Sequence, residues 1–166
     1  MPQLSLDRLS ATRSTLPILR WAGPWRFSAF IGKMESGRAD IEDPLFLGMR
    51  LAFQPLPILE VGLSRTAQFC GQNAARTRAT CDLAQIGRVL IGKDNNGLRG
   101  VTGETEPGNQ MAGIDLRLTS PIRALPLAIN AQLIGEDSSN NSKSIVPNRF
   151  LGQFGAEGWW LRESGD

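Results

Sequence analysis

The sequence contains no histidine. This absence excludes a Ser-His-Asp triad, a Cys-His catalytic pair and any metal site with a histidine ligand from this chain. The sequence also lacks a G-x-S-x-G nucleophile elbow, which counts against an acyl hydrolase. A glycosidase with two catalytic carboxylates needs neither feature, so that class of enzyme stays open.

Long runs of one residue class are also missing. No window of about 18 apolar residues exists, so no transmembrane helix is present, whereas a transmembrane β-barrel stays open because its strands alternate. The 18 Lys and Arg residues are nearly balanced by 16 Asp and Glu and form no run, which counts against nucleic acid as a partner. The start, MPQLSLDRLSATRST, lacks the apolar core of a secretory signal. An exported protein with this sequence would therefore carry its signal upstream.

Cysteine is scarce, since Cys70 and Cys81 are the only two in the chain. Ten residues separate them, and a disulfide could close this loop in an oxidising compartment. Two free thiols are the alternative. A zinc site is not indicated because the two cysteines have no further ligands beside them. Their placement in one polar loop favours the disulfide.

The chain is rich in segments of about ten residues in which apolar and polar side chains alternate. The clearest example is LFLGMRLAFQPLPILEVGLSRTAQ, residues 45–68, where two such segments flank a double-proline turn. Alternation is typical of a β-strand with one apolar face. We predict strands near 25–34, 45–54, 58–69, 110–119, 127–135 and 150–160, with a further candidate in QLSLDRLS.

The connections between these segments alternate between short turns and long polar loops. The longest loop, about 70–109, contains CDLAQIGRVLIGKD, where Asp82 is a candidate N-cap and Gly92 a candidate stop for a short helix. Residues 35–43 and 136–148 are also polar and predicted as loops. A ten-residue strand spans roughly 33 Å, or about 25 Å of membrane normal when tilted, whereas soluble strands average about five or six residues. Lipid is therefore as good a candidate as a soluble core for the apolar face.

Five segments of the chain resemble, in this order, the capsule assembly protein Wzi family: LRWAGPWRFSAFIGKME, LFLGMRLAFQPLPILEVGLSRTAQFCG, EPGNQMAGIDLRLTSP, QLIGED and RFLGQFGAE. Together they cover most of residues 15–160. The resemblance implies an outer-membrane β-barrel of Gram-negative bacteria. It also implies a lectin-like protein, not an enzyme, that anchors or organises capsular or extracellular polysaccharide at the cell surface. We expect no cofactor and no metal.

With this resemblance, the predicted fold is all-β: an antiparallel up-and-down transmembrane β-barrel with a short helix in one long loop. The resemblance implies a barrel of about eighteen strands, more than 166 residues can supply at about ten residues a strand. We therefore expect residues 1–166 to form a single partial barrel domain of about six or seven strands, unstable as a monomer in water because its edges and apolar face are exposed. The expected partners are polysaccharide, outer-membrane lipid and the missing remainder of the barrel, and the expected location is the bacterial outer membrane.

Three alternatives remain at this point. A soluble β-sandwich carbohydrate-binding module would show the same alternation, with the polar face in water. A polysaccharide hydrolase would need two carboxylates, for which the loop residues Glu104, Glu106, Glu136 and Asp137 are candidates. A general porin would conduct ions without depending on polysaccharide.

The candidate polysaccharide-binding residues are Arg65, Gln68, Asn109 and Gln110. Arg65 lies in the apolar register of its strand, where a charge at the lipid midplane costs about 2–4 kcal/mol. At the outer rim it could bind sugar hydroxyls or carboxylates, and contact with lipid headgroups is the alternative. The other three are neutral donors and acceptors suited to sugar hydroxyls.

Overall fold

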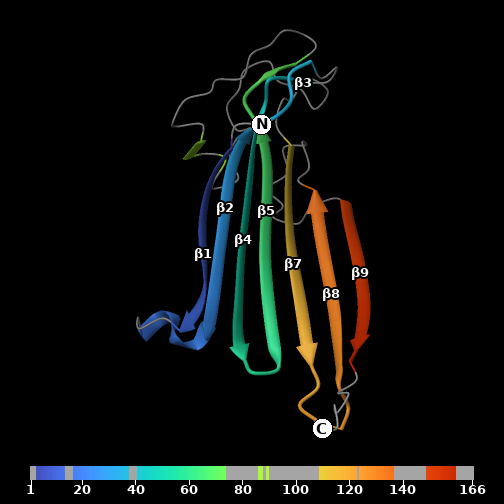
Figure 1. Cartoon of the computed structure of the whole chain (residues 1–166). Coiled ribbons are helices and arrows are strands. Elements are labelled where there is room, and N and C mark those ends of the chain that lie inside the picture. Colours follow the sequence, from blue (N-terminus) through green and yellow to red (C-terminus); the bar gives the residue numbers. More distant parts are fainter. Residues whose placement is uncertain are drawn as a thin grey trace, which may run out of the picture.

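The computed structural model describes residues 3–13, 17–37, 41–73, 86–87, 89, 109–122, 124–136 and 149–159. Seven long strands form one antiparallel sheet in this part of the chain (Figure 1). They are β1 (Gln3–Arg13), β2 (Pro24–Lys33), β4 (Leu45–Leu56), β5 (Leu59–Phe69), β7 (Asn109–Thr119), β8 (Leu127–Glu136) and β9 (Arg149–Gly158).

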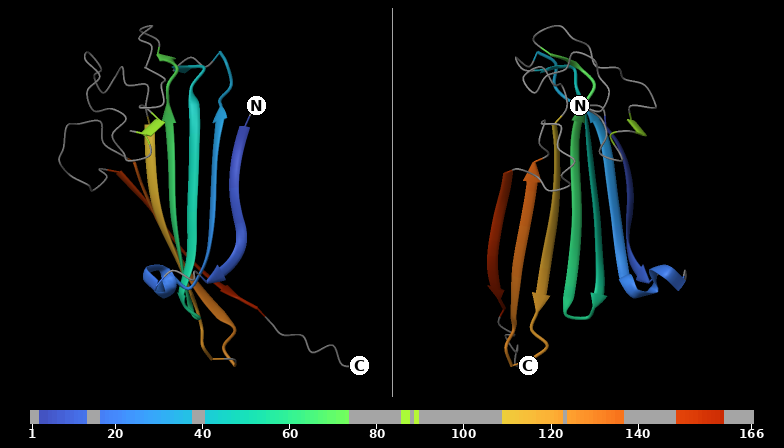
Figure 2. Two further views of the ribbon diagram at one scale, coloured as in Figure 1. Left: turned by 90° about the vertical axis from the view of Figure 1, so that its left-hand side faces the viewer. Right: turned by 180° about the vertical axis from the view of Figure 1, so that it is seen from behind.

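The sheet has the simplest possible topology, because the order is β1-β2-β4-β5-β7-β8-β9 and each strand pairs with the next long strand along the chain. Figure 2 shows that the sheet is curved and open. Among the described residues, β1 and β9 each pair on one side only. The predicted all-β, antiparallel up-and-down architecture is confirmed, and the sheet that the chain forms is not closed.

Strand length follows from the alternating sequence. The seven strands contain 10 to 12 residues each, longer than the usual strand of a soluble protein. Six of them begin and end within two residues of the predicted ranges. The candidate strand in QLSLDRLS is the beginning of β1.

A short second ladder extends the β4–β5 pair at the end of the sheet where β4 begins and β5 ends, which we call the long-loop end. It consists of β3 (Ile41–Glu42) and β6 (Gln72–Asn73), which keep the register of β4 with β5. Both lie in segments predicted as loops. The ladder is interrupted where Asp43 and Cys70 have positive φ angles of 53° and 60° and where Pro44 lacks an N–H group. These residues separate the two ladders, which a pattern of alternation does not reveal.

A 3₁₀ helix, η1 (Pro17–Ala22), leads into β2 at the opposite end of the sheet. A short turn joins β4 to β5 at this end, which we call the short-turn end. Gly23 follows it with a φ angle of +69°, a backbone conformation that residues other than glycine rarely adopt. A Cβ atom at this position would overlap the backbone carbonyl oxygen of Gln54 in β4. The turn from η1 into β2 therefore requires glycine both for its dihedral angle and for its close approach to β4.

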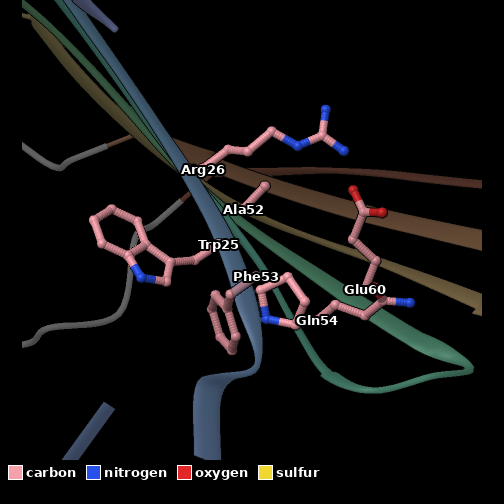
Figure 3. A pocket seen from close by; sticks show the side chains of 7 residues that line it. Trp25, Arg26, Ala52, Phe53, Gln54 and Glu60 are labelled. Carbon is pink, nitrogen blue, oxygen red and sulfur yellow. The ribbon is translucent and has the colours of Figure 1, made fainter. Parts of the chain in front are cut away.

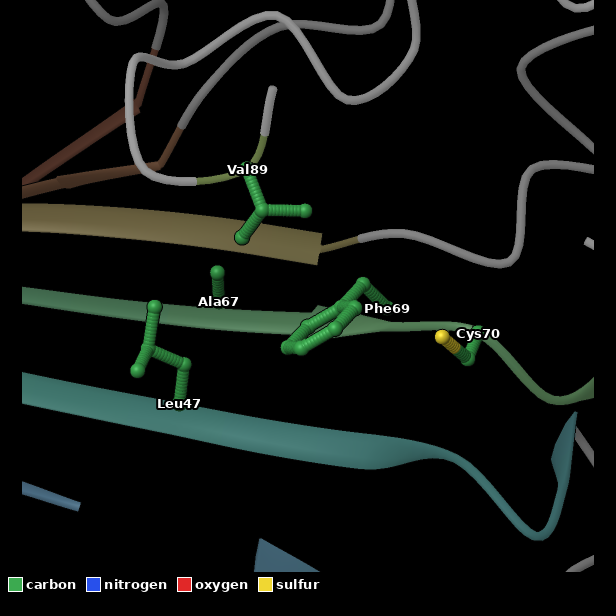
Figure 4. Packing of buried hydrophobic residues seen from close by; sticks show 5 residues of the cluster. All are labelled: Leu47, Ala67, Phe69, Cys70 and Val89. Carbon is green, nitrogen blue, oxygen red and sulfur yellow. The ribbon is translucent and has the colours of Figure 1, made fainter. Parts of the chain in front are cut away.

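The buried apolar cluster is small and lies at the long-loop end (Figure 4). Leu47, Ala67, Phe69 and Cys70 of the β4–β5 region pack with Val89 from the long connection before β7. Residues 86, 87 and 89 are helical, in agreement with the short helix predicted there, whose remaining residues lie outside the described ranges. No helix in the described part of the chain is long and apolar enough to cross a membrane.

Candidate functional site

The cross-strand register divides the side chains of the sheet between two faces of opposite character. One row runs Phe27–Leu51–Leu63–Ile114–Leu133 through five strands, and the neighbouring row on the opposite face runs Ser28–Arg50–Ser64–Gly113–Ile134. We call the face that carries the first row the apolar face and the face that carries the second row the polar face. The polar face carries most of the strand charges, including Arg50, Glu60, Asp115, Arg117 and Glu157.

The apolar face is largely uncovered across β7, β8 and β9. Its side chains there include Leu118, Ile129, Leu133 and Phe154, whose exposed fractions are 47%, 51%, 45% and 83%. Exposed apolar patches on this scale mark surfaces that contact protein or lipid. Across these three strands the face is therefore unsuited to water.

The polar face carries an ion pair that crosses an entire strand. The Arg50 guanidinium of β4 donates two hydrogen bonds, of 2.5 and 2.9 Å, to the two carboxylate oxygens of Asp115 in β7. Strand β5 lies between them, and Gly62 is its residue beneath the pair. A Cβ atom at Gly62 would overlap the Asp115 carboxylate and lie 2.6 Å from Arg50 Nη2. The absence of a side chain at Gly62 therefore permits this bidentate pair.

A second ion pair continues the same arrangement toward β9. Arg117 Nε of β7 donates a 2.6 Å hydrogen bond to Glu157 Oε1 of β9, across β8. Ala128 lies opposite both Thr119 and Glu157 on the intervening strand and is fully buried. A small residue, Ala128, thus lies on the middle strand beside this bridge as well. Because Asp115 and Arg117 are successive polar-face residues of β7, the two pairs connect β4, β7 and β9.

Gly62→Ala is expected to lower the free energy of unfolding by about 1 kcal/mol, because the new methyl group displaces both partners of an ion pair whose side chains are partly exposed. In an Arg50→Ala/Asp115→Ala background the same substitution is expected to cost less than about 0.5 kcal/mol, since nothing remains to be displaced. Equilibrium unfolding of the four proteins measures this coupling.

Gly155→Ala is the matched control for this experiment. Gly155 is also a polar-face glycine within a strand, and nothing lies within 4 Å of a Cβ atom there. We expect little change in its free energy of unfolding. An equal loss for the alanine variants at positions 62 and 155, or a Gly62→Ala cost unaffected by removal of the charges, would contradict the role assigned to Gly62.

A small hollow lies at the short-turn end of β2, β4 and β5 (Figure 3). It is lined by Pro24, Trp25, Arg26, Ala52, Phe53, Gln54 and Glu60, and its volume is about 30 Å³. That volume accommodates about one water molecule, so the hollow is too small for a sugar. In the described part of the chain, no group of three or more Cys, Asp or Glu residues is placed to hold a metal ion.

Comparison with known proteins accounts for this two-faced sheet. The sequence model of the capsule assembly protein Wzi family matches residues 1–151. The chain belongs to this family. It is 32% identical over 143 residues to an uncharacterized 55.8 kDa protein in the cps region of Klebsiella pneumoniae, a match that covers 85% of this chain and 26% of that protein. The resemblance seen in five segments of the sequence is thus confirmed.

A solved structure extends the comparison to three dimensions. Wzi of Escherichia coli, described as an outer membrane protein involved in group 1 capsule assembly and as a carbohydrate-binding β-barrel, is similar with a TM-score of 0.64 and 26% identity. The match covers 93% of this chain and 29% of that chain. This member of the Wzi family therefore spans less than a third of the length of both relatives.

The four candidate polysaccharide-binding residues fall into two pairs on opposite faces of the Wzi-type sheet. Gln68 and Asn109 lie on the polar face as direct cross-strand neighbours. Arg65 and Gln110 lie on the apolar face, where Arg65 Nη2 donates a hydrogen bond to Gln110 Oε1. The structure thus brings the residues together two by two but does not gather all four at one place.

The Arg65–Gln110 pair on the apolar face is partly buried. Gln110 is only 6% exposed, and Arg65 is half-buried between Met49 and Ala112 of the adjacent strands. Arg65 lies four residues before the end of β5, in the half of the strand that leads to the long connection. Its contact with Gln110 satisfies part of the hydrogen-bonding capacity of a guanidinium on an otherwise apolar surface.

The remaining sequence candidates are only partly within the described residues. Cys70 is disulfide-bonded and buried, whereas its predicted partner Cys81 lies outside the described ranges, so the pairing stays a prediction. Glu136 lies at the end of β8, 3.7 Å from Arg149 of β9. Glu104, Glu106 and Asp137 lie outside the described residues.

Proposed function

We propose that this chain is part of the wall of an outer-membrane β-barrel that holds capsular or extracellular polysaccharide at the bacterial cell surface without catalysing a reaction. One observation carries the proposal: a Wzi-family sheet of strands long enough to cross a membrane has one exposed apolar face and one charged face. Strands of 10 to 12 residues match the apolar band of an outer-membrane barrel.

Lipid is the partner that we propose for the apolar face. Leu118, Ile129 and Leu133 are each close to half exposed, and water is an unfavourable solvent for so much apolar surface. Trp21 lies at the short-turn end and packs edge-on against Phe53, with ring centroids 6.1 Å apart. Aromatic side chains at this level are typical of a membrane–water interface. This arrangement supports the proposed outer-membrane location.

Further strands of the same barrel are the partners that we propose for the two open edges. β1 and β9 present unpaired backbone groups on their outer sides within the described sheet. Such groups are costly in lipid, and barrel closure pairs them. The greater length of both relatives supports the proposal that additional strands supply this pairing.

The polar face is the surface that we propose for polysaccharide, with Gln68 and Asn109 as contacts. Its charges are largely neutralised by the Arg50–Asp115 and Arg117–Glu157 pairs, and its neutral side chains include Gln132 and Asn130. Hydrogen-bonding groups of this kind suit sugar hydroxyls. Asp115 and Glu157 each accept a hydrogen bond from an arginine, which supports a structural role for these two carboxylates.

The experiment is deletion of the encoding gene, followed by measurement of polysaccharide bound to cells and polysaccharide released into the medium. We expect the bound fraction to fall and the released fraction to rise without any change in polymer chain length, and the wild-type gene to restore retention. Unchanged retention would contradict the proposal. Shortened chains or new reducing ends that depend on the protein would indicate a hydrolase instead.

A further inference from the structure

We infer that Phe30 and Phe46, together with Gln68 and Asn109, form a saccharide subsite on the polar face at the long-loop end of the sheet. A pyranose ring would stack its apolar C–H face on the aromatic rings and direct its hydroxyls to the two amides. The inference rests on the proposed function, because it locates where on the polar face the polysaccharide binds.

The first observation is that two aromatic side chains occupy the polar face. Phe30 of β2 and Phe46 of β4 have ring centroids 5.9 Å apart and planes inclined by 41°. Phe30 is 36% exposed and Phe46 is half-buried. Both belong to the register that carries Ser28, Arg50 and Ser64. Contact with lipid, proposed for the opposite face, does not explain apolar rings on the polar face.

The second observation is that each ring lies opposite a glycine. Phe30 pairs with Gly48, and Phe46 pairs with Gly32. A Cβ atom at Gly48 would overlap ring carbons of Phe30, so this ring lies across the strand instead of standing away from it. Its outer surface is therefore available as a flat platform. Packing over glycine also stabilises strands, so stability and binding must be measured separately.

The third observation is the row of polar groups beside the platform. The register runs Gly32–Phe46–Gln68–Asn109 across four strands. Adjacent strands are about 4.8 Å apart, so the distance from Phe46 to Asn109 is roughly 10 Å, comparable to the length of one or two sugar residues. Each amide offers a carbonyl acceptor and two N–H donors to ring hydroxyls. Aromatic surface and amides thus lie side by side.

Position within the fold agrees with this assignment. The subsite lies where β2, β4 and β5 meet the long connections, at the end of the sheet opposite the short proline-containing turn of β4 and β5 (Figure 1). Long loops are on the external side of outer-membrane barrels. A polymer held at the cell surface would meet this end of the polar face first.

The test uses the intact protein purified from outer membranes in detergent, and capsular polysaccharide purified from the same cells. Phe30→Leu and Phe46→Leu keep apolar volume but remove the ring, and each is expected to weaken binding by about tenfold. Gly48→Ala keeps the Phe30 ring but displaces it, and a loss of similar size is expected. Phe30→Tyr restores an aromatic platform and is expected to bind as the wild type does.

Phe154→Leu is the matched control, because Phe154 is 83% exposed and lies on the apolar face. Its polysaccharide affinity is expected to be unchanged. Circular dichroism and unfolding of every variant separate loss of fold from loss of binding. If the wild type binds and the folded Phe30→Leu and Phe46→Leu variants bind equally well, the subsite is wrong and the proposed function stands. A wild type that binds no polysaccharide overturns both.

Discussion

Leu133→Arg is expected to destabilise the membrane-embedded protein by about 2–4 kcal/mol, the cost of an arginine near the bilayer midplane on the lipid face of a barrel. Leu133 lies near the middle of the exposed apolar face, between Ile114 and Gly152 of the adjacent strands. Its side chain is 45% exposed, so the loss of stability would not come from disruption of a packed core. Reversible unfolding in lipid vesicles or detergent measures the change.

Gln132→Arg is the matched control because Gln132 precedes Leu133 on the same strand and lies on the polar face. Its cross-strand neighbours are Asp115 and Gln153, and an added guanidinium there is expected to change stability by less than about 0.5 kcal/mol. Equal, small effects of the arginine substitutions at positions 132 and 133 would indicate that both faces contact water, as in a soluble β-sandwich.

Gly23→Ala is expected to cost about 2–5 kcal/mol. A φ angle of +69° accounts for about 1–2 kcal/mol of strain in a residue with a Cβ atom. Overlap with the Gln54 carbonyl adds about 1–3 kcal/mol because a strand backbone cannot move aside as a side chain can. We expect the midpoint of denaturant unfolding to fall accordingly.

Gly37→Ala separates these two contributions. Gly37 has a φ angle of +84°, but nothing lies within 4 Å of a Cβ atom at this position. Its substitution is therefore expected to cost only the strain, about 1–2 kcal/mol. If the alanine variants at positions 23 and 37 lose the same stability, the close approach of Gly23 to β4 contributes nothing, contrary to the packing described above.

Alternation was enough to predict most of the sheet. In LFLGMRLAFQPLPILEVGLSRTAQ, it separates Leu51 and Leu63 from Arg50 and Ser64, and the structure pairs Leu51 with Leu63 and Arg50 with Ser64. The period of two in side-chain direction is a local property of extended backbone. Strand ends and the composition of each face could therefore be derived without knowledge of distant contacts.

The same two-residue period of side-chain direction also predicts that the candidate site is divided between two faces. Arg65 follows Leu63 by two residues and Gln110 precedes Ala112 by two, so both belong to the apolar register. Gln68 and Asn109 belong to the other. The register of Arg65 was recognised in the sequence, but the four residues were grouped by their chemistry, and the structure shows directly that they divide between two faces.

Contacts across two strands could not be derived from the sequence. The pairing of Arg50 with Asp115 joins residues 65 positions apart, and it depends on β4, β5 and β7 being neighbours and on the missing side chain of Gly62. The Phe30 ring over Gly48 is of the same kind. Strand order, register and glycine placement must all be known before such contacts can be identified.

A nitroxide scan along β8, residues 127–136, in the protein reconstituted in lipid vesicles tests the central claim most directly. Each position is labelled singly, with the native cysteines kept oxidised, and its collisions with oxygen and with a water-soluble nickel complex are measured. We predict a period of two: labels at Ile129, Ala131 and Leu133 contact oxygen dissolved in lipid, and labels at Asn130 and Gln132 contact the nickel complex. Equal access of the nickel complex to both sets would contradict a membrane-spanning sheet.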